Sequence, residues 1–257
     1  MNAQASDKLD YGIDAPGLVR FFLSAGTVAA VLFFAAHLLL GYSSIWRALV
    51  VLFLGIAAVY LIGMGCLMLY WSKAIKVRQR EHTLDLIPWR GDERVLDVGC
   101  GRGLMLIGAA LRLTTGRATG IDIWEAKDQS ANSPQGTRDN AEKAGVLDKI
   151  DIQTGDMRKL PFEDGSFDVV VSHWVVHNLA GEADRNMALS EMVRVLCPGG
   201  QLILCDIEHR DAYVAKMKAL GLQECRMLFQ PIADTVVGAV SFGSFRPTTI
   251  MACKAAY

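Results

Sequence analysis

The chain contains 257 residues, of which 52% are hydrophobic, 21% charged and 8% aromatic. Its 26 Lys and Arg and 27 Asp and Glu give a net charge of −1, whereas a protein that coats nucleic acid is expected to carry a basic excess. The composition also excludes a disordered, collagenous or coiled-coil chain, and the length is enough for one or two domains with a buried core.

Two apolar segments follow one another near the N-terminus. Residues 21–40 and 48–71 contain no Asp, Glu, Lys or Arg, and about 20 apolar residues are enough for a helix to cross the hydrocarbon core. Neither segment has a polar stripe at helical spacing, so residues 1–71 are predicted to form an N-terminal tail and a hairpin of two transmembrane helices. The alternatives are a buried hairpin of a soluble protein and a cleaved signal peptide, which the absence of a small-residue cleavage site disfavours.

Basic residues flank these segments unevenly. Lys8 and Arg20 precede the first segment, and Arg47 alone lies in the loop. Four more follow the second segment, namely Lys73, Lys76, Arg78 and Arg80. This asymmetry predicts that both termini face the cytoplasm. Residues 72–90 are interpreted as a basic juxtamembrane linker or helix at the anionic membrane surface, so that the lipid bilayer is an expected partner.

The cysteines indicate a reduced environment. They form no CxxC pair and have no metal-ligand spacing with histidine, so the sequence predicts neither disulfides nor a metal site. The six are Cys66, Cys100, Cys197, Cys205, Cys225 and Cys253.

Residues 91–257 are predicted to form a separate domain, because short β-branched runs alternate there with helical patterns. The expected strands are residues 94–98, 118–122, 150–155, 167–172, 201–206, 222–228 and 248–254. The expected helices are residues 104–112, 138–144, 183–196 and 211–220. This alternation indicates an α/β domain with a mostly parallel sheet, and in such sheets ligands bind beyond the carboxyl ends of the strands.

The first expected strand runs into the sequence VLDVGCGRG. Gly99, Gly101 and Gly103 allow the backbone to turn sharply and to approach a ligand closely. An acid, Asp97, precedes these glycines by two residues. A glycine loop of this kind indicates a ligand site, but dinucleotide-binding folds use a similar one.

Two more acids stand at the ends of the next strands. Asp122 lies about 20 residues past the glycine loop, where a carboxylate accepts hydrogen bonds from ribose hydroxyls. Asp156 follows the third strand and suits an exocyclic adenine amine. Together with Asp97 they fit a ligand that has a ribose, an adenine and an ammonium group. They fit a pyrophosphate poorly, because Asp97 lies near its negative charge.

These motifs resemble those of the class I S-adenosylmethionine-dependent methyltransferases, in particular the small-molecule branch that includes quinone-biosynthesis enzymes. The resemblance covers roughly residues 90–254 and lies in VLDVGCGRG, GIDIW, GDMRKLPFEDGSFDVVVS and LCPGGQLIL. It implies a Rossmann-like sheet of seven strands, the last of them antiparallel, with helices on both faces. It also implies S-adenosylmethionine as the cofactor and S-adenosylhomocysteine as the product.

The resemblance assigns roles by position. Gly99, Gly101 and Gly103 would line the methionine moiety, with Asp97 near its amino group. The remaining expected contacts are Asp122 with the ribose, Ile123 packed on the adenine, Asp156 with the adenine amine, the Met157 amide with the ring, and Ser172 with the amino-acid end.

The segment SHWVVHNL contains two candidates for a catalytic base. His173 and His177 are four residues apart, which puts them on one face if the segment is helical. A base is useful when the methyl acceptor is a hydroxyl, a thiol or an amine. The alternative for His177 is a structural role beside the cofactor.

The polar segment that follows Asp122 is open to two interpretations. It is either a solvated loop with turn residues or a lid over cofactor or substrate. The lid would use Trp124, Asp128, Gln129 and Asn132.

The sequence thus predicts a membrane-anchored, cytosol-facing methyltransferase that acts on a small, lipophilic acceptor. One alternative is a membrane protein that binds S-adenosylmethionine without catalysis, and another is a methyltransferase that acts on a membrane protein. A nucleotide-dependent oxidoreductase on a similar sheet is disfavoured by Asp97 and Asp156.

Overall fold

The computed structural model describes residues 9–40, 44–228, 238 and 247–256. The chain divides into two compact units. One comprises Met1–Tyr11, Gln79–Trp124 and Asn132–Tyr257, and the other comprises Gly12–Arg78 and Glu125–Ala131.

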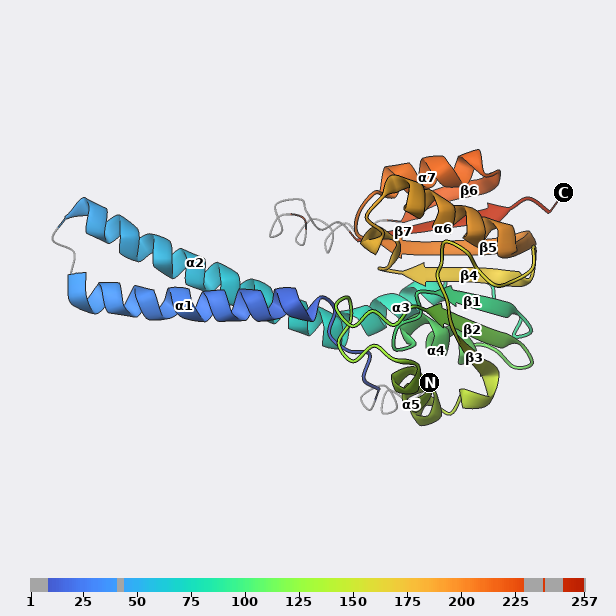
Figure 1. The fold of residues 1–257 in the computed structure, drawn as a ribbon, viewed down its shortest axis with the longest axis horizontal. Coiled ribbons are helices and arrows are strands. Elements are labelled where there is room, and N and C mark those ends of the chain that lie inside the picture. The colour runs from blue at the N-terminus through green and yellow to red at the C-terminus, as the bar shows by residue number, and fades with distance from the viewer. Residues whose placement is uncertain (1–8, 41–43, 229–237, 239–246, 257) are drawn as a thin grey trace. The chain divides into compact units, whose positions relative to one another are not determined.

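The second unit is built on a hairpin of two long apolar helices, α1 (Pro16–Leu40) and α2 (Ile45–Tyr70), which confirms the two predicted helices (Figure 1). Glycines let the helices approach closely. A Cβ added to Gly26 would lie 2.7 Å from Ile62 Cγ1, and one added to Gly65 would lie 2.6 Å from Leu23 Cδ2. The antiparallel pairing of α1 with α2 therefore depends on small residues at the contact.

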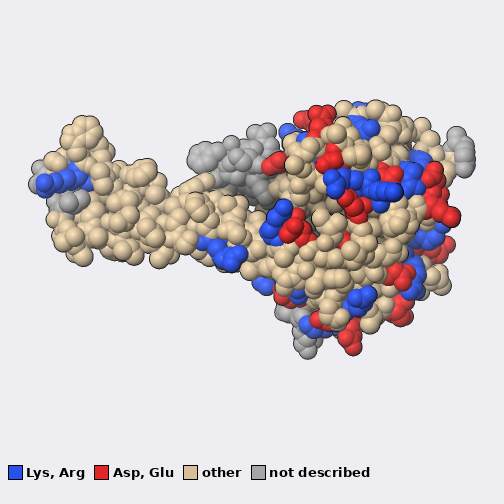
Figure 2. Space-filling model, viewed as in Figure 1, with Lys and Arg blue, Asp and Glu red and all other residues tan. Residues whose placement is uncertain are grey.

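Most of the hairpin surface is apolar and exposed. Of the 18 most apolar consecutive residues in each helix, 17% are buried inside the protein. On the face that Figure 2 shows, the charged side chains of the hairpin lie at its ends, and residues 21–40 and 48–71 contain no Asp, Glu, Lys or Arg. A hairpin in the core of a soluble protein would have most of this surface covered, so the exposure disfavours that alternative.

The chain continues from α2 through a π-helical turn, η2 (Trp71–Ile75), into α3 (Lys76–Leu84). Within the hairpin unit, the buried Lys76 Nζ donates to Asp14 Oδ1 and to the Gly12 carbonyl, both at 3.1 Å. Lys76 is therefore held by protein groups instead of facing lipid. The exposed members of the predicted basic cluster are Lys73 and Arg78.

The segment that follows Asp122 pairs with residues just before α1. Ser130 donates its backbone N–H to the Ile13 carbonyl at 3.0 Å, and its side chain accepts from the Ile13 N–H at 2.8 Å. The Ala15 N–H donates to the Asp128 carbonyl at 2.9 Å. Residues 125–131 thus belong to the hairpin unit, which neither interpretation of the segment anticipated.

The other unit contains a seven-stranded sheet in the order β3-β2-β1-β4-β5-β7-β6. All neighbouring pairs are parallel except those with β7, which is antiparallel to both β5 and β6, as the resemblance implied. The strands are β1 (Arg94–Val98), β2 (Arg117–Asp122), β3 (Ile150–Thr154), β4 (Phe167–His173), β5 (Leu196–Asp206), β6 (Leu222–Leu228) and β7 (Thr248–Lys254).

Helices flank both faces of this sheet (Figure 1). The strand order reverses after β1, and right-handed crossovers then place the first two connecting helices opposite the last two. The four are α4 (Leu104–Ala110), α5 (Pro134–Ala144), α6 (Glu182–Val195) and α7 (Arg210–Ala219), with short 3₁₀ turns η3 (Leu147–Lys149) and η4 (Val176–Asn178). One core cluster, with the fully buried Val170, Leu189 and Leu204, includes residues of the sheet, α6 and α7. Every residue of α4 is buried as well.

Helix α5 begins four residues earlier than predicted. The Ser133 side chain accepts a hydrogen bond from the Gly136 N–H at 3.1 Å, and Pro134 occupies the first turn. Serine is a favoured N-cap residue and proline suits the first helical position, so this turn-like sequence starts a helix.

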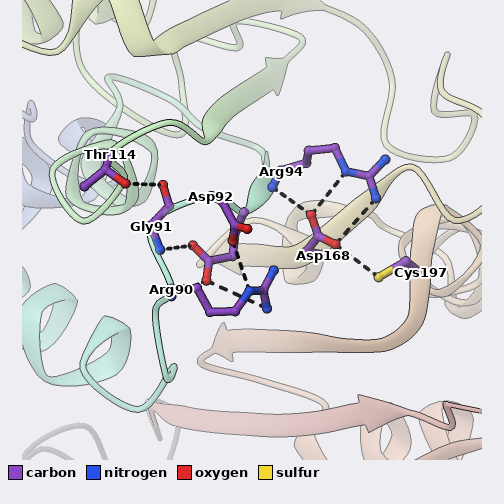
Figure 3. Close-up of polar contacts among 8 residues, drawn as sticks. Arg90, Gly91, Asp92, Arg94, Thr114, Asp168 and Cys197 are labelled. Carbon is purple, nitrogen blue, oxygen red and sulfur yellow. Dashed lines mark hydrogen bonds and ion pairs between the residues drawn. The ribbon is translucent and has the colours of Figure 1, made fainter.

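Polar contacts hold the parallel strands β1, β4 and β5 together at the end of the sheet where these strands begin (Figure 3). Asp168 Oδ2 accepts from the backbone N–H of Arg94 at 2.9 Å and from its Nε at 3.1 Å. The Cys197 thiol donates to Asp168 Oδ1 at 3.5 Å. These bonds join the first residues of β1, β4 and β5 to one another and leave the carboxyl ends of the strands for a ligand.

Candidate functional site

The turn after β1 is made of glycines with a left-handed backbone. The φ angles of Gly99, Gly101 and Gly103 are 73°, 51° and 84°. Residues other than glycine rarely adopt such positive values. The N–H groups of Gly99 and Cys100 both donate to the carbonyl of Ile121, at 2.8 and 3.1 Å. These bonds join the turn to the carboxyl end of β2.

Gly99 has a second reason to lack a side chain. A Cβ at this position would lie 2.5 Å from Val175 Cγ1. Val175 belongs to the loop between β4 and η4, so this loop packs directly on the glycine turn. The position of one loop therefore sets the position of the other.

Asp97 is a buried carboxylate at the end of β1. Its Oδ2 accepts the Leu106 N–H at 2.8 Å, while its Oδ1 has no hydrogen-bond partner in the described part of the chain. Burial, with a smaller contribution from the charge of Asp122, raises the pKa of this carboxyl to about 8. A cationic donor of a bound ligand would satisfy the open oxygen and the charge together.

Asp122, at the end of β2, accepts hydrogen bonds on both oxygens. Its Oδ2 accepts from the Gly101 N–H at 2.8 Å. Its Oδ1 accepts from the Trp124 N–H at 2.6 Å and from Asn132 Nδ2 at 3.3 Å. The Oδ1 atom of Asn132 is buried and has no partner among the residues that the structure describes. Asp122 and Asn132 together present acceptors suited to hydroxyl groups.

The residues beside Asp122 provide an apolar surface. Ile123 is 60% exposed, which is unusual for isoleucine next to a buried strand. Trp124 follows with a left-handed φ of 64°, and its indole N–H donates to Thr154 Oγ1 at 2.8 Å. Strained backbone of this kind is concentrated at functional sites.

Asp156 lies in the loop after β3 and is paired with an arginine that the sequence analysis did not single out. Arg158 Nε lies 2.9 Å from Asp156 Oδ2, and these hydrogen bonds lower the pKa of the Asp156 carboxyl. The neighbouring Met157 packs against the core. The carboxylate is therefore ionised and oriented.

Ser172 is a predicted site residue whose side chain makes a structural hydrogen bond within the sheet. It is fully buried, and its hydroxyl donates to the Val98 carbonyl at 3.0 Å. The bond joins β4 to β1. Its expected approach to the amino-acid end of a cofactor stays a prediction.

The two histidines do not share a helical face. β4 ends at His173, Trp174 takes a left-handed φ of 56°, and His177 lies in the separate 3₁₀ turn η4. A single helix cannot form there because β4 still pairs with β5 at His173. The His173 ring stacks on Trp174, with centroids 5.0 Å apart.

His177 is bound at two points by an aspartate that the sequence analysis missed. Its Nδ1 lies 2.5 Å from Asp206 Oδ1, and its backbone N–H donates to Asp206 Oδ2 at 3.0 Å. Asp206 is the last residue of β5 and is buried. Like Asp97 and Asp122 it is an acid at a strand end, which is the signal that could have identified it.

A stretch before α1 also reaches the glycine turn. Arg102 Nε donates to the Asp10 carbonyl at 2.6 Å, and Asn140 Nδ2 donates to the carbonyls of both Asp10 and Arg102 at 2.9 Å. Next to it, Arg80 donates to the hydroxyl of the buried Tyr11 at 2.8 Å. The bonds of Asp10 to Arg102 and Asn140 thus connect the stretch before α1 to the glycine turn.

The predicted cofactor residues are thus gathered at the carboxyl ends of β1, β2 and β3, except Ser172, which lies in β4; His173 is the last residue of β4 and His177 lies after it. Within the described residues, no group of three His, Cys, Asp or Glu is arranged to hold a metal ion. Burial, with Asp97 and Asp122 nearby, raises the pKa of the Cys100 thiol well above its usual value, so that this thiol in the glycine turn stays neutral.

Comparison with known proteins gives a consistent picture. A family model described as a methyltransferase domain matches residues 96–204. The chain is 31% identical over 172 residues to 27-O-demethylrifamycin SV methyltransferase of Amycolatopsis mediterranei (strain S699), which covers 66% of this chain and 56% of that protein. The chain spans about half the length of the curated relatives it matches.

Solved structures share the fold. The [4+2]-cyclase SpnF superposes with a TM-score of 0.57 at 19% identity, over 73% of this chain and 84% of that one. A geranyl diphosphate methyltransferase in complex with S-adenosylmethionine gives a TM-score of 0.54 at 18% identity, over 70% of this chain and 85% of that one.

The contact between Gly99 and Val175 predicts a specific stability difference. Gly99→Ala should lower the free energy of unfolding by about 1–2 kcal/mol more than Gly145→Ala, measured by thermal denaturation in detergent. Gly145 is a matched control because its φ is 69° but a Cβ there meets no atom within 4 Å. Adding Val175→Ala to Gly99→Ala should recover part of the loss. Equal effects at the two glycines would contradict the steric explanation.

Proposed function

We propose that the protein is a membrane-anchored, S-adenosylmethionine-dependent methyltransferase that acts on a small, lipophilic acceptor; the match of a methyltransferase-domain model to residues 96–204 supports the activity. The observation that carries the proposal is the set of unsatisfied acceptors around the glycine turn. Asp97 Oδ1 and Asn132 Oδ1 are both buried without partners in the described residues. Such atoms are costly to bury unless a ligand supplies the donors.

The residues at the site fit the parts of S-adenosylmethionine. Asp97 would hold the ammonium group, the glycine turn would line the methionine chain, and Asp122 with Asn132 would accept from the ribose hydroxyls. Ile123 would offer an apolar surface to the adenine, and Asp156 with the Met157 amide would hold its polar edge. When bound, the cofactor supplies a methyl group already activated by the sulfonium. The protein then has to align the acceptor and exclude water.

The hairpin supports the membrane anchor. α2 has 26 residues, which corresponds to about 39 Å, enough to cross a hydrocarbon core of about 30 Å. Trp46 and Tyr70 lie near its two ends and are 75% and 58% exposed. Aromatic residues at both ends are typical of spanning helices, and the basic residues outside them favour cytoplasmic termini.

The anchor favours a lipophilic acceptor. An enzyme held at the bilayer meets molecules that partition into it, such as a lipid, a quinone-like ring or a lipophilic amine or thiol. The geranyl diphosphate methyltransferase has a similar fold, and its name states that it methylates geranyl diphosphate. Because the cyclase shares the fold as well, the transfer itself has to be tested by product formation.

Loss of the Asp122 carboxylate tests the cofactor site. We expect Asp122→Ala to weaken S-adenosylhomocysteine binding about 100-fold, since hydrogen bonds to a charged group contribute about 1.5–3 kcal/mol each. Calorimetric titration of detergent-purified protein measures this, with Asp211→Ala as a matched control at an exposed aspartate. A folded Asp122→Ala variant of unchanged affinity, or a wild type that binds NAD instead, would refute the site.

The raised pKa of Asp97 makes cofactor binding depend on pH. In the free protein this carboxyl is protonated below about pH 8, and an ammonium ligand favours the ionised form. Binding below pH 8 therefore releases a proton, and the affinity for S-adenosylhomocysteine should fall roughly tenfold per unit as the pH drops from 7.5 to 6. Titrations in buffers of different ionisation enthalpy count the protons. Asp97→Asn should bind weakly and without this dependence; wild-type binding without proton release would contradict the assignment.

The orientation of the anchor is tested by cysteine labelling in intact cells. In a variant with its six cysteines replaced by alanine, Ser44→Cys at the hairpin loop should react with a membrane-impermeant maleimide. Asp211→Cys in α7 should react only after the membrane is permeabilised. The reverse pattern would overturn the orientation, and release of the protein by alkaline carbonate would overturn the membrane anchor.

A further inference from the structure

The two edges of the sheet differ in how they are protected against further pairing. β3 is the outermost strand on one side and β6 on the other (Figure 1). The pairing of β6 with β7 shifts register between Gln223 and Arg226, and Glu224 between them has a left-handed φ of 51°. Bulges and charged side chains are devices by which natural sheets keep an edge from pairing with another chain. The edge at β6 has both.

The edge at β3 lacks these devices. The strand IDIQT pairs with β2 without a register shift and contains neither proline nor lysine. Its one charged residue, Asp151, is bound inside the sheet, where its Oδ1 accepts from Arg117 Nη2 at 2.9 Å. An edge strand directs part of its backbone N–H and C=O groups away from its neighbour. Within the part of the chain that the structure describes, no strand lies beyond β3, so this edge is open to one more.

An open groove of about 360 Å³ runs beside the same strand. Its lining residues are Arg138, Leu147, Ile150, Asp151, Ile152 and Gln153. Ile152 pairs beside Gly120, where an added Cβ would meet Leu106 of α4, so Ile152 lies on the face of the sheet that α4 covers. It is only half-buried there. A strand added to β3 would therefore cover apolar surface and fill the groove with its own side chains.

The sequence of β3 is complementary to a second copy of itself. In an antiparallel pair with Ile152 on the two-fold axis, all five residues are paired. The opposite pairs are then Ile152 with its own copy, Asp151 with Gln153, and Ile150 with Thr154. The central pair is apolar, and the Gln153 amide is a donor for the Asp151 carboxylate. An axis shifted by one residue toward the start of the strand would instead oppose two Asp151 carboxylates, which is unfavourable.

We propose that the occupant of this edge is a second copy of the chain, and that two protomers join their sheets through antiparallel β3 strands. The pairing requires no sequence other than the one that each protomer already carries. A two-fold contact uses the same surface on both protomers and closes after two of them, so neither β3 edge stays open to further chains. The proposal does not depend on the proposed function.

Charge substitutions at the axis test this contact in the full chain. Sedimentation velocity of the detergent-purified protein should show a reversible dimer. Ile152→Lys and Ile152→Glu each place two like charges face to face, and each should raise the dimer dissociation constant about tenfold or more. An equimolar mixture of the two variants places lysine opposite glutamate, so it should restore the dimer to within about threefold of the wild-type constant.

The other edge strand provides the matched control. Gln223→Lys and Gln223→Glu, at an exposed residue of β6, should leave the constant within about threefold of the wild-type value. Oxidative cross-linking tests the register in a variant with its six cysteines replaced by alanine. Ile152→Cys should give a disulfide-linked dimer, because its two copies face each other. Thr154→Cys should not, because its two copies lie about 14 Å apart along the strands.

Other outcomes overturn the proposal. A wild type that stays monomeric at every concentration would do so, as would a dimer that persists in both Ile152 charge variants and so lies on another surface. Folded charge variants that dissociate but do not associate when mixed would show that no two-fold axis passes through Ile152. A monomeric wild type whose Ile152→Cys variant cross-links to a different protein in membranes would assign the edge to another partner. None of these results bears on cofactor binding.

Discussion

The site depends on the burial of a carboxyl group, that of Asp97, of which one oxygen has a hydrogen-bond partner, the Leu106 N–H, and the other has none among the described residues. An unpaired polar atom in such surroundings destabilises the folded chain, so the free protein holds this group at a cost that a cationic ligand would relieve. The pairing of β1 with β2 and β4 and the Leu106 N–H keep this carboxyl group in position.

Local patterns predicted most of the sheet and the acids that stand at the ends of its first strands. The runs before Asp97 and Asp122 are β-branched and bounded by glycine, so strand ends and the acids on them follow from the sequence. Contacts between distant segments did not follow. Asp206 lies 29 residues from His177, and Arg158 pairs with Asp156 through a turn whose geometry no period encodes. The early start of α5 was missed because Ser133 and Pro134 are equally common in turns and at helix starts.

The chemistry is divided along the sheet. Strands β1, β2 and β3 end in groups that suit a charged, hydroxylated ligand, whereas β4 and β5 end in a histidine and its carboxylate. The loop containing Val175 connects the two halves through its contact with Gly99. A small residue is needed at this contact because a Cβ at Gly99 would overlap the side chain of Val175.

The pairing of Asp128 and Ser130 with Ala15 and Ile13 has a consequence for how separable the hairpin is from the rest of the chain. The residues that flank this stretch, Trp124 and Asn132, are the ones that hydrogen-bond Asp122. A fragment trimmed to begin after the second long helix would lack residues 13–15 and leave that stretch unpaired. Residues 125–131 and the hairpin therefore form one structural unit even though more than 50 residues separate them in the sequence, and a cut after α2 divides that unit.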